Sequence, residues 1–200
     1  LQLTSGLNPY DVHIPTGGTY VVVPCQYFAV EWIDEDIDKY FLQQDRFTPM
    51  ERLRVFHAIV SSIQSLHENQ VFHRDIKMDN LRHVTRNGQR QIIAIDLGTA
   101  ARFASAPIQT EYVQQVGAPI YASLEALCGL AGNRIVAPRT DPYAIGCLLF
   151  ELFNKDYYFH KLLARNPNFR LLYAALRTQV NPLATDIDQA KDWEKALDKL

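Results

Sequence analysis

The segment from Thr48 to His67 constrains the fold of this chain more than any other. Thr48-Pro49-Met50-Glu51 combines an N-cap threonine, a proline suited to the first helical position and a glutamate that completes a capping box. Apolar residues then recur at helical spacing, at Leu53, Phe56, Ile59, Val60, Ile63 and Leu66. The pattern predicts a long amphipathic helix that ends near His67 and buries one face in a core.

Weaker signals surround this helix. Residues 20–23 and 26–32 are predicted strands, 37–42 a short amphipathic piece, and 71–72 a short strand. Residues 81–84 and 92–95 predict a hairpin, because the turn between them contains Asn87-Gly88. Residues 97–122 are small, polar and aperiodic, which is typical of a long functional loop.

Helical patterns dominate the rest of the chain. Further helices are predicted at 141–153, 159–165, 168–178 and 188–200, with Trp193, Leu197 and Leu200 on one face of the last. Lead strands followed mainly by helices, with one embedded hairpin, indicate an α+β fold dominated by helix.

Composition excludes several classes of protein. The net charge of −2 and the pI near 6.3 argue against a protein that coats nucleic acid or an anionic membrane. The longest apolar run, 144–150, is too short to span a bilayer. Three cysteines (Cys25, Cys128 and Cys147) without a CxxC pair argue against a disulfide framework and a zinc cluster. They fit a reducing compartment, so we expect a cytoplasmic or nuclear protein with buried thiols.

Two charged clusters bracket the predicted hairpin. Asp75 and Lys77 lie two residues apart in a loop, where a carboxylate could accept a hydroxyl proton beside an ammonium that steadies a transferring anion. Asn80 and Asp96 are oxygen donors at the two ends of the hairpin, so folding brings them together. Two hard oxygen ligands suit Mg²⁺, which keeps waters and binds substrate phosphates. Together these residues provide the groups needed for phosphoryl transfer.

At this point the sequence resembles a known family. His73-Arg74-Asp75-Ile76-Lys77-Met78-Asp79-Asn80 resembles the catalytic loop of eukaryotic-type protein kinases, H-R-D-x-K-x-x-N. Further segments match in the right order: Asp96-Leu97-Gly98 the metal-binding D-F-G, 117–125 the end of the activation segment, 141–146 the start of the central helix, and 30–37 the hinge. The resemblance covers roughly residues 20 to 155 and implies a protein kinase-like fold.

The resemblance implies a role for each matched residue. Asp75 would be the catalytic base, and Lys77 would contact the γ-phosphate of ATP, which is typical of the serine/threonine class. Asn80 and Asp96 would hold Mg²⁺. In the hinge, the backbone of Glu31 and Ile33 would bind the adenine, with Val30 as gatekeeper.

Supporting residues follow from the same resemblance. His73 and Asp141 would brace the catalytic loop. Arg74 would pair with a phosphate on the activation segment, for which Thr110 and Tyr112 are both candidates. Glu125 would pair with a downstream arginine, and the candidates are Arg165, Arg170 and Arg177.

Three positions depart from the family pattern. Ala118 replaces a threonine whose hydroxyl bridges the base and the lysine in the family, and this bears on activity and acceptor class. Leu124 replaces the proline before Glu125, and Leu97 replaces phenylalanine in an apolar position.

Neither a G-x-G-x-x-G loop nor a V-A-I-K-like strand precedes the hinge. We therefore expect residues 1–32 to be a remnant of the small lobe. Residues 33–200 would form the large helical lobe, with the catalytic loop at 73–80 and the activation segment at 96–125. A piece without a cover over ATP should be inactive alone.

Three functions remain open. The first is a serine/threonine protein kinase with a protein substrate and, as a further partner, a regulatory protein. The second is a pseudokinase-like scaffold that binds partners without catalysis, which Ala118 and the missing nucleotide cover favour. The third, a small-molecule kinase of the same fold, fits less well because the segment ending in Glu125 typically positions peptides.

Overall fold

The computed structural model describes residues 10–25, 31–102 and 117–199 and divides into two units, Leu1–Asp34 and Glu35–Leu200. In the first unit, β1 (Tyr10–Thr16) and β2 (Thr19–Cys25) form an antiparallel hairpin. β2 confirms the strand predicted at 20–23, whereas β1 was not predicted. Gly17 and Gly18 make the turn, with φ of +52° and +101°. Of the strand predicted at 26–32, residues 31–32 are not extended into a strand and the others lie outside the described residues.

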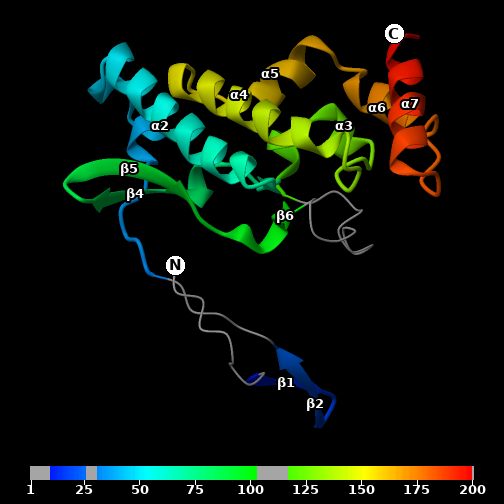
Figure 1. Cartoon of the computed structure of the whole chain (residues 1–200), viewed down its shortest axis with the longest axis horizontal. Coiled ribbons are helices and arrows are strands. Elements are labelled where there is room, and N and C mark those ends of the chain that lie inside the picture. The colour runs from blue at the N-terminus through cyan, green and yellow to red at the C-terminus, as the bar shows by residue number, and fades with distance from the viewer. Residues whose placement is uncertain (1–9, 26–30, 103–116, 200) are drawn as a thin grey trace. The chain divides into compact units, whose positions relative to one another are not determined.

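The second unit is built around two helices, α2 (Pro49–Glu68) and α4 (Thr140–Phe153), which pack side by side (Figure 1). The predicted capping box of α2 is present. Thr48 Oγ1 accepts from the amide of Glu51 at 3.3 Å, and the Glu51 carboxylate accepts from the amide of Thr48 at 2.7 Å. This cap satisfies amides that the first turn of a helix otherwise leaves unpaired.

The buried face of α2 differs in part from the predicted face. Val55, Ile59 and Ile63 are buried, but Leu53 is 44% exposed. The buried residues recur every four positions, which places Leu53 beside the stripe rather than within it. On α4, Ala144, Leu148 and Leu152 face the same core.

The other elements surround this pair. The strands are β3 (Val71–Phe72) paired with β6 (Ala101–Arg102), and β4 (Leu81–Arg86) paired with β5 (Gln89–Ala94). The remaining helices are α1 (Lys39–Leu42), α3 (Leu124–Leu127), α5 (Tyr158–Arg165), α6 (Phe169–Arg177) and α7 (Asp186–Leu197). The predicted helices and the predicted hairpin are thus confirmed, with boundaries shifted by a few residues.

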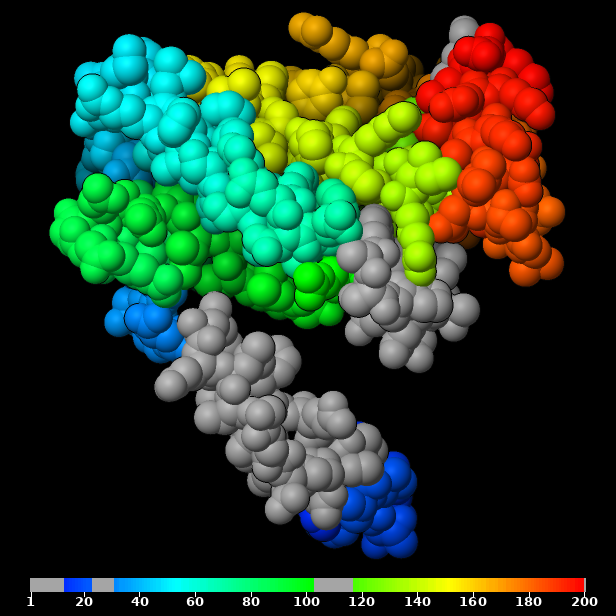
Figure 2. Space-filling model, viewed as in Figure 1, coloured from blue at the N-terminus to red at the C-terminus, as the bar shows by residue number. Residues whose placement is uncertain are grey.

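The β4–β5 hairpin lies directly against α2 (Figure 2). Its turn residues Asn87 and Gly88 both have positive φ, at +51° and +71°, which matches the twist of a tight hairpin. At its open end the amide of Ile95 donates to the carbonyl of Asn80 at 2.9 Å. The hairpin therefore brings Asn80 next to Asp96, as the sequence predicts.

A second core lies under the last helices. Trp193 of α7 is 1% exposed and packs with Leu176, Val136 and Leu130. Cys128 and Cys147 are both buried, as expected for thiols that pack as small apolar groups. Among the described helices, none is long and apolar enough to cross a membrane.

The packing predicts a large effect for Leu148→Ala. Leu148 is fully buried between α2 and α4, so truncation should lower the free energy of unfolding by about 3 kcal/mol. Leu171→Ala, at a side chain that is 71% exposed, should change it by less than about 0.5 kcal/mol. Urea denaturation measures both, and equal losses would contradict the central position of α4 in the core.

Candidate active site

Asp141, in the first turn of α4, holds the loop from His73 to Asn80. The amides of His73 and Arg74 donate to Oδ2 and Oδ1 of Asp141, both at 2.8 Å. His67 Nε2 bonds Oδ2 at 2.8 Å, and the carboxylate is only 1% exposed. Asp141 is also favourably placed at a helix N-terminus. It therefore clamps the loop to α4, which agrees with the bracing role that we expected.

Two further contacts complete the brace. The ring of His73 bonds the carbonyl of Ile95 through Nε2 at 2.9 Å, which ties the loop to the strand that precedes Asp96. His67 was not predicted as part of this network, because it lies 74 residues from Asp141 in the sequence. Only the fold shows that the end of α2 meets the start of α4.

Three donors hold the carboxylate of Asp75. The amide of Ala118 donates to Oδ1 at 2.9 Å, Nδ2 of Asn80 donates to Oδ2 at 3.0 Å, and Lys77 Nζ lies 3.0 Å from Oδ2. Sequence spacing placed Lys77 near this carboxylate, whereas the bond from Asn80 was not predicted and the Ala118 amide comes from a distant segment. The carboxylate is therefore fixed in direction by groups from two parts of the chain.

These donors also determine the charge of Asp75. Burial alone would raise its pKa, but the hydrogen bonds from Lys77, Ala118 and Asn80 outweigh burial and hold the pKa below the ordinary value of an aspartate. Asp75 is consequently ionised at neutral pH. An ionised carboxylate held in this way can accept a hydrogen bond from a hydroxyl group.

The contact with Ala118 depends on Gly117. Gly117 has φ of +81°, and a Cβ there would lie 2.5 Å from the carbonyl oxygen of Arg74 and 2.9 Å from Oδ1 of Asp75. Only glycine allows the backbone to approach so closely. The methyl group of Ala118 cannot bridge Asp75 and Lys77, but Lys77 lies 3.0 Å from Oδ2 of Asp75 and the amide of Ala118 bonds Oδ1.

Asn80 and Asp96 offer oxygen ligands that fit Mg²⁺. Asn80 uses Nδ2 to bond the backbone and side chain of Asp75, and among the described residues no donor bonds its Oδ1. Asp96 is exposed and has φ of +57°, an unusual left-handed conformation for a residue other than glycine. Two hard oxygens match the preference of Mg²⁺. The described residues contain no group of three or more His, Cys, Asp or Glu suited to a metal.

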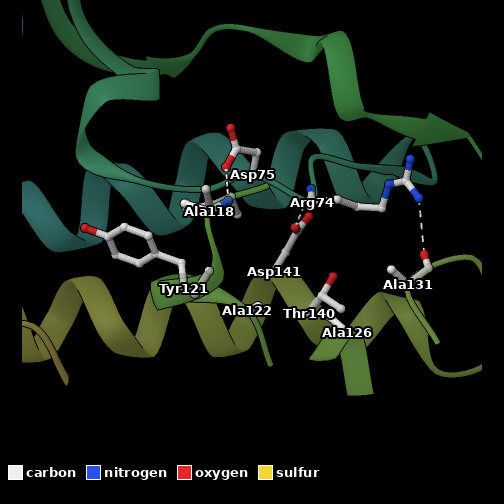
Figure 3. Close-up of a pocket in the computed structure, with 11 residues that line it drawn as sticks. Arg74, Asp75, Ala118, Tyr121, Ala122, Ala126, Ala131, Thr140 and Asp141 are labelled. Carbon is white, nitrogen blue, oxygen red and sulfur yellow. Dashed lines mark hydrogen bonds between the residues drawn. The ribbon is translucent and has the colours of Figure 1, made fainter. Parts of the chain in front are cut away.

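A small cavity of about 20 Å³, room for a single water, lies between the loop and α4 (Figure 3). It is walled by small side chains, among them Ala118, Ala122 and Ala126. Figure 3 shows Asp75 bonded to Ala118 on one side and Arg74 turned toward Ala131 on the other. The small side chains let the 118–122 segment settle closely on the loop.

The other predicted residues have mixed outcomes. Arg74 is buried with φ of +64°, and its guanidinium donates to the carbonyls of Thr99 at 2.8 Å and Ala131 at 3.2 Å. Its predicted phosphate partners, Thr110 and Tyr112, lie outside the described residues, so that pairing stays a prediction. Within the described part of the chain, Glu125 forms no ion pair with any of the three candidate arginines, so the predicted pairing is not present.

The predicted adenine-binding residues all precede the second unit in the chain. Val30 lies outside the described residues. Glu31 and Ile33 belong to the first unit and lie outside helices and strands. Their role in nucleotide binding stays a prediction.

Gly117→Ala should damage this site. The added methyl would collide with the Arg74 carbonyl and the Asp75 carboxylate, so we expect a loss of at least about 3 kcal/mol in the free energy of unfolding. Gly129→Ala is a matched control, because Gly129 has a similar φ of +88° but open space around it. It should lose only about 1 kcal/mol. Equal losses in urea denaturation would show that the close approach at Gly117 is unimportant.

Comparison with known proteins agrees with this geometry. The sequence profile of the protein kinase domain matches residues 22–198. NUAK family SNF1-like kinase 2 of Homo sapiens is 29% identical over 135 residues, which cover 65% of this chain and 20% of that protein. The serine/threonine-protein kinase PrkC of Bacillus subtilis is 31% identical over 127 residues, which cover 63% of this chain and 18% of that protein.

A solved structure shares the fold. The crystal structure of the yeast RNA Pol II CTD kinase CTDK-1 complex matches with a TM-score of 0.51 and 22% identity, over 77% of this chain and 47% of that chain. The chain spans about a fifth of the length of the curated relatives it matches. Since the profile covers most of the sequence, this chain belongs to the protein kinase domain family.

Proposed function

We propose that this chain supplies the catalytic loop for ATP-dependent phosphoryl transfer to serine or threonine hydroxyls of proteins, and that its 200 residues are inactive alone because they lack a cover over ATP. The observation that supports the proposal most strongly is the carboxylate of Asp75. It is ionised, partly buried and oriented by Lys77, Asn80 and the amide of Ala118. Relatives named as serine/threonine-protein kinases support the acceptor class.

In this proposal Asp75 accepts a hydrogen bond from the substrate hydroxyl. This bond directs a lone pair of the hydroxyl oxygen toward the phosphoryl group. Lys77 neutralises part of the charge on the transferred phosphoryl and keeps Asp75 in place. Asn80 and Asp96 would hold Mg²⁺, which when bound neutralises the phosphates of ATP. Positioning and charge neutralisation supply most of the rate in phosphoryl transfer.

The partners and the location follow from the same proposal. The substrate is a protein, and a regulatory protein is a further partner. The yeast neighbour, whose structure is that of a complex, supports this second partner by analogy. The buried, unpaired thiols of Cys128 and Cys147 suit the cytoplasm or the nucleus, where ATP and Mg²⁺ are abundant.

Replacing Asp75 by asparagine tests the proposal. Asp75→Asn should lower kcat for phosphorylation of a protein substrate by the full-length protein at least about 100-fold, because the hydroxyl loses its base. Asp45→Asn is the matched control. Asp45 also pairs with a lysine, Lys155 at 2.7 Å, but on the exposed surface. Equal rates for wild type and Asp75→Asn would show that Asp75 is not the base. No transfer by wild type would favour a scaffold.

The metal ligands predict a separate effect on binding. Asp96→Asn removes a charged oxygen ligand, so the Mg²⁺ concentration needed for half-maximal binding of a fluorescent ATP analogue should rise about tenfold, or ~1.4 kcal/mol. Asn80→Ala should act in the same direction. Asp45→Asn again serves as control. An unchanged Mg²⁺ requirement in both site variants would place the metal elsewhere.

A further inference from the structure

The arginines of α5 and α6 have no role in the site described above. Arg165, Arg170 and Arg177 were the candidates to pair with Glu125, and none of them does so. All three are exposed, and the described residues offer none of them an ion pair or a side-chain hydrogen bond. An exposed arginine without a counter-ion in its own chain can bind an acidic group from outside, because its planar guanidinium matches a carboxylate.

The segment that carries these arginines is basic throughout. Residues 157–185 contain these three arginines and Lys161 but no aspartate or glutamate, in a chain whose net charge is −2. Lys161 is neutralised from outside the segment, since its Nζ lies 3.0 Å from Oδ2 of Asp156. The unbalanced positive charge is therefore concentrated on the arginines, where it attracts acidic groups of a partner.

The packing of α6 fixes which of its side chains face solvent. Its inner side packs in the second core with Trp193 through three residues, Leu172, Tyr173 and Leu176. On the other side Arg170, Ala174 and Arg177 follow one another at helical spacing, and all three are exposed. The solvent face of α6 therefore presents two arginines with one small residue between them.

This face also has a defined spacing and one large apolar side chain. Arg170 and Arg177 stand two turns apart, or roughly 10 Å along the helix axis. Leu171, next to Arg170 in the sequence, is 71% exposed. Arginines beside an exposed apolar side chain are typical of a contact between proteins.

Among the described residues, no charged group neutralises the arginines of α6. Arg177 acts on the thiol of Cys128, but burial raises the pKa of that thiol to about 12, so the thiol is uncharged at neutral pH. α7, which packs beside α6 (Figure 1), carries four acidic side chains: Asp186, Asp188, Asp192 and Glu194. Asp186 pairs with Arg134 at 4.0 Å rather than with α6.

The acidic side chains of α7 also restrict the kind of partner. A flat anionic membrane or a long nucleic acid would meet them within a Debye length of the arginines and be repelled. A single helix laid along α6 has a much smaller contact area. The arrangement of charges therefore favours a narrow acidic partner.

We propose that the exposed face of α6 binds an acidic amphipathic helix of a partner protein. One carboxylate of that helix pairs with Arg170, a second carboxylate two turns further along pairs with Arg177, and an apolar side chain packs on Leu171. Both ion pairs form together because two helices have the same rise per residue, and Ala174 lets the partner approach closely. The proposal goes beyond phosphoryl transfer and does not depend on it.

Binding of a designed peptide tests the proposal. The probe is a fluorescein-labelled, helix-forming peptide with two glutamates two turns apart and leucines on the same face. Fluorescence anisotropy with the 200-residue chain gives its Kd. The double variant Arg170→Gln/Arg177→Gln should raise the Kd about tenfold, as expected for two surface ion pairs. Lys39→Gln/Lys155→Gln is the matched control, because it removes two positive charges from other exposed sites and should leave the Kd unchanged.

A second peptide separates the geometry from the charge. It has the same composition as the probe, but its glutamates are moved to opposite faces of the helix, and it should bind about tenfold more weakly. Equal binding of the two peptides, or the same Kd for wild type and the double variant, would overturn the proposal. Arg170→Gln alone should raise the Kd about threefold, so the test stands even if Arg177→Gln disturbs the fold near Cys128.

Two other anions test the choice of partner. Vesicles that contain phosphatidylserine and a short DNA duplex are measured at physiological salt, and both should bind more weakly than the peptide. Tighter binding of either one that is lost in the double variant would assign this face to a membrane or to nucleic acid and overturn the proposal. None of these measurements uses ATP, so they are independent of whether the chain takes part in phosphoryl transfer.

Discussion

The clamp of Asp141 on the backbone of His73 and Arg74 is the interaction on which the site depends. A carboxylate that is 1% exposed would be costly without partners, and here two amides and the ring of His67 satisfy it. Because Asp141 stands in the first turn of α4, the loop takes its position from the central helix of the core. Asp75, Lys77 and Asn80 belong to that loop, and His73 ties it to Ile95, the residue before Asp96.

The carboxylate of Asp75 is positioned by the side chains of Lys77 and Asn80 on one oxygen and by a backbone amide on the other. Asp75 receives the amide of Ala118, and Gly117 makes room for that approach. A chain with alanine at residue 118 therefore still holds the carboxylate of Asp75 through the backbone amide of that residue. A hydroxyl at residue 118 would add a contact, but it is not the group that sets the direction of the carboxylate.

Short-range sequence signals predicted most of the helices and strands, and they also predicted the polar side chains of the loop from His73 to Asn80. The capping box of α2 and the Asn87-Gly88 turn are short-range features, so the helix and the hairpin follow from a few adjacent residues. The spacing of Asp75 and Lys77 likewise predicted their proximity, and the hairpin predicted that of Asn80 and Asp96. The hydrogen bonds between His67 and Asp141 and between the hydroxyl of Tyr121 and the carboxylate of Glu151 were not predictable from the sequence. Each joins residues far apart in the chain, and only packing of whole helices decides such contacts.

Both ends of the segment between Thr99 and Gly117 are tied to the same three loop residues. On one side Thr99 Oγ1 donates to the carbonyl of His73 at 2.9 Å, and on the other Ala118 bonds Asp75. Both contacts are made to the loop from His73 to Asn80, so Thr99 and Ala118 are held at the same place. Lengthening the chain between them changes its closure entropy only slowly, by about 0.6 kcal/mol for each doubling. Insertions or deletions between these two anchors should therefore leave the position of Asp75 unchanged.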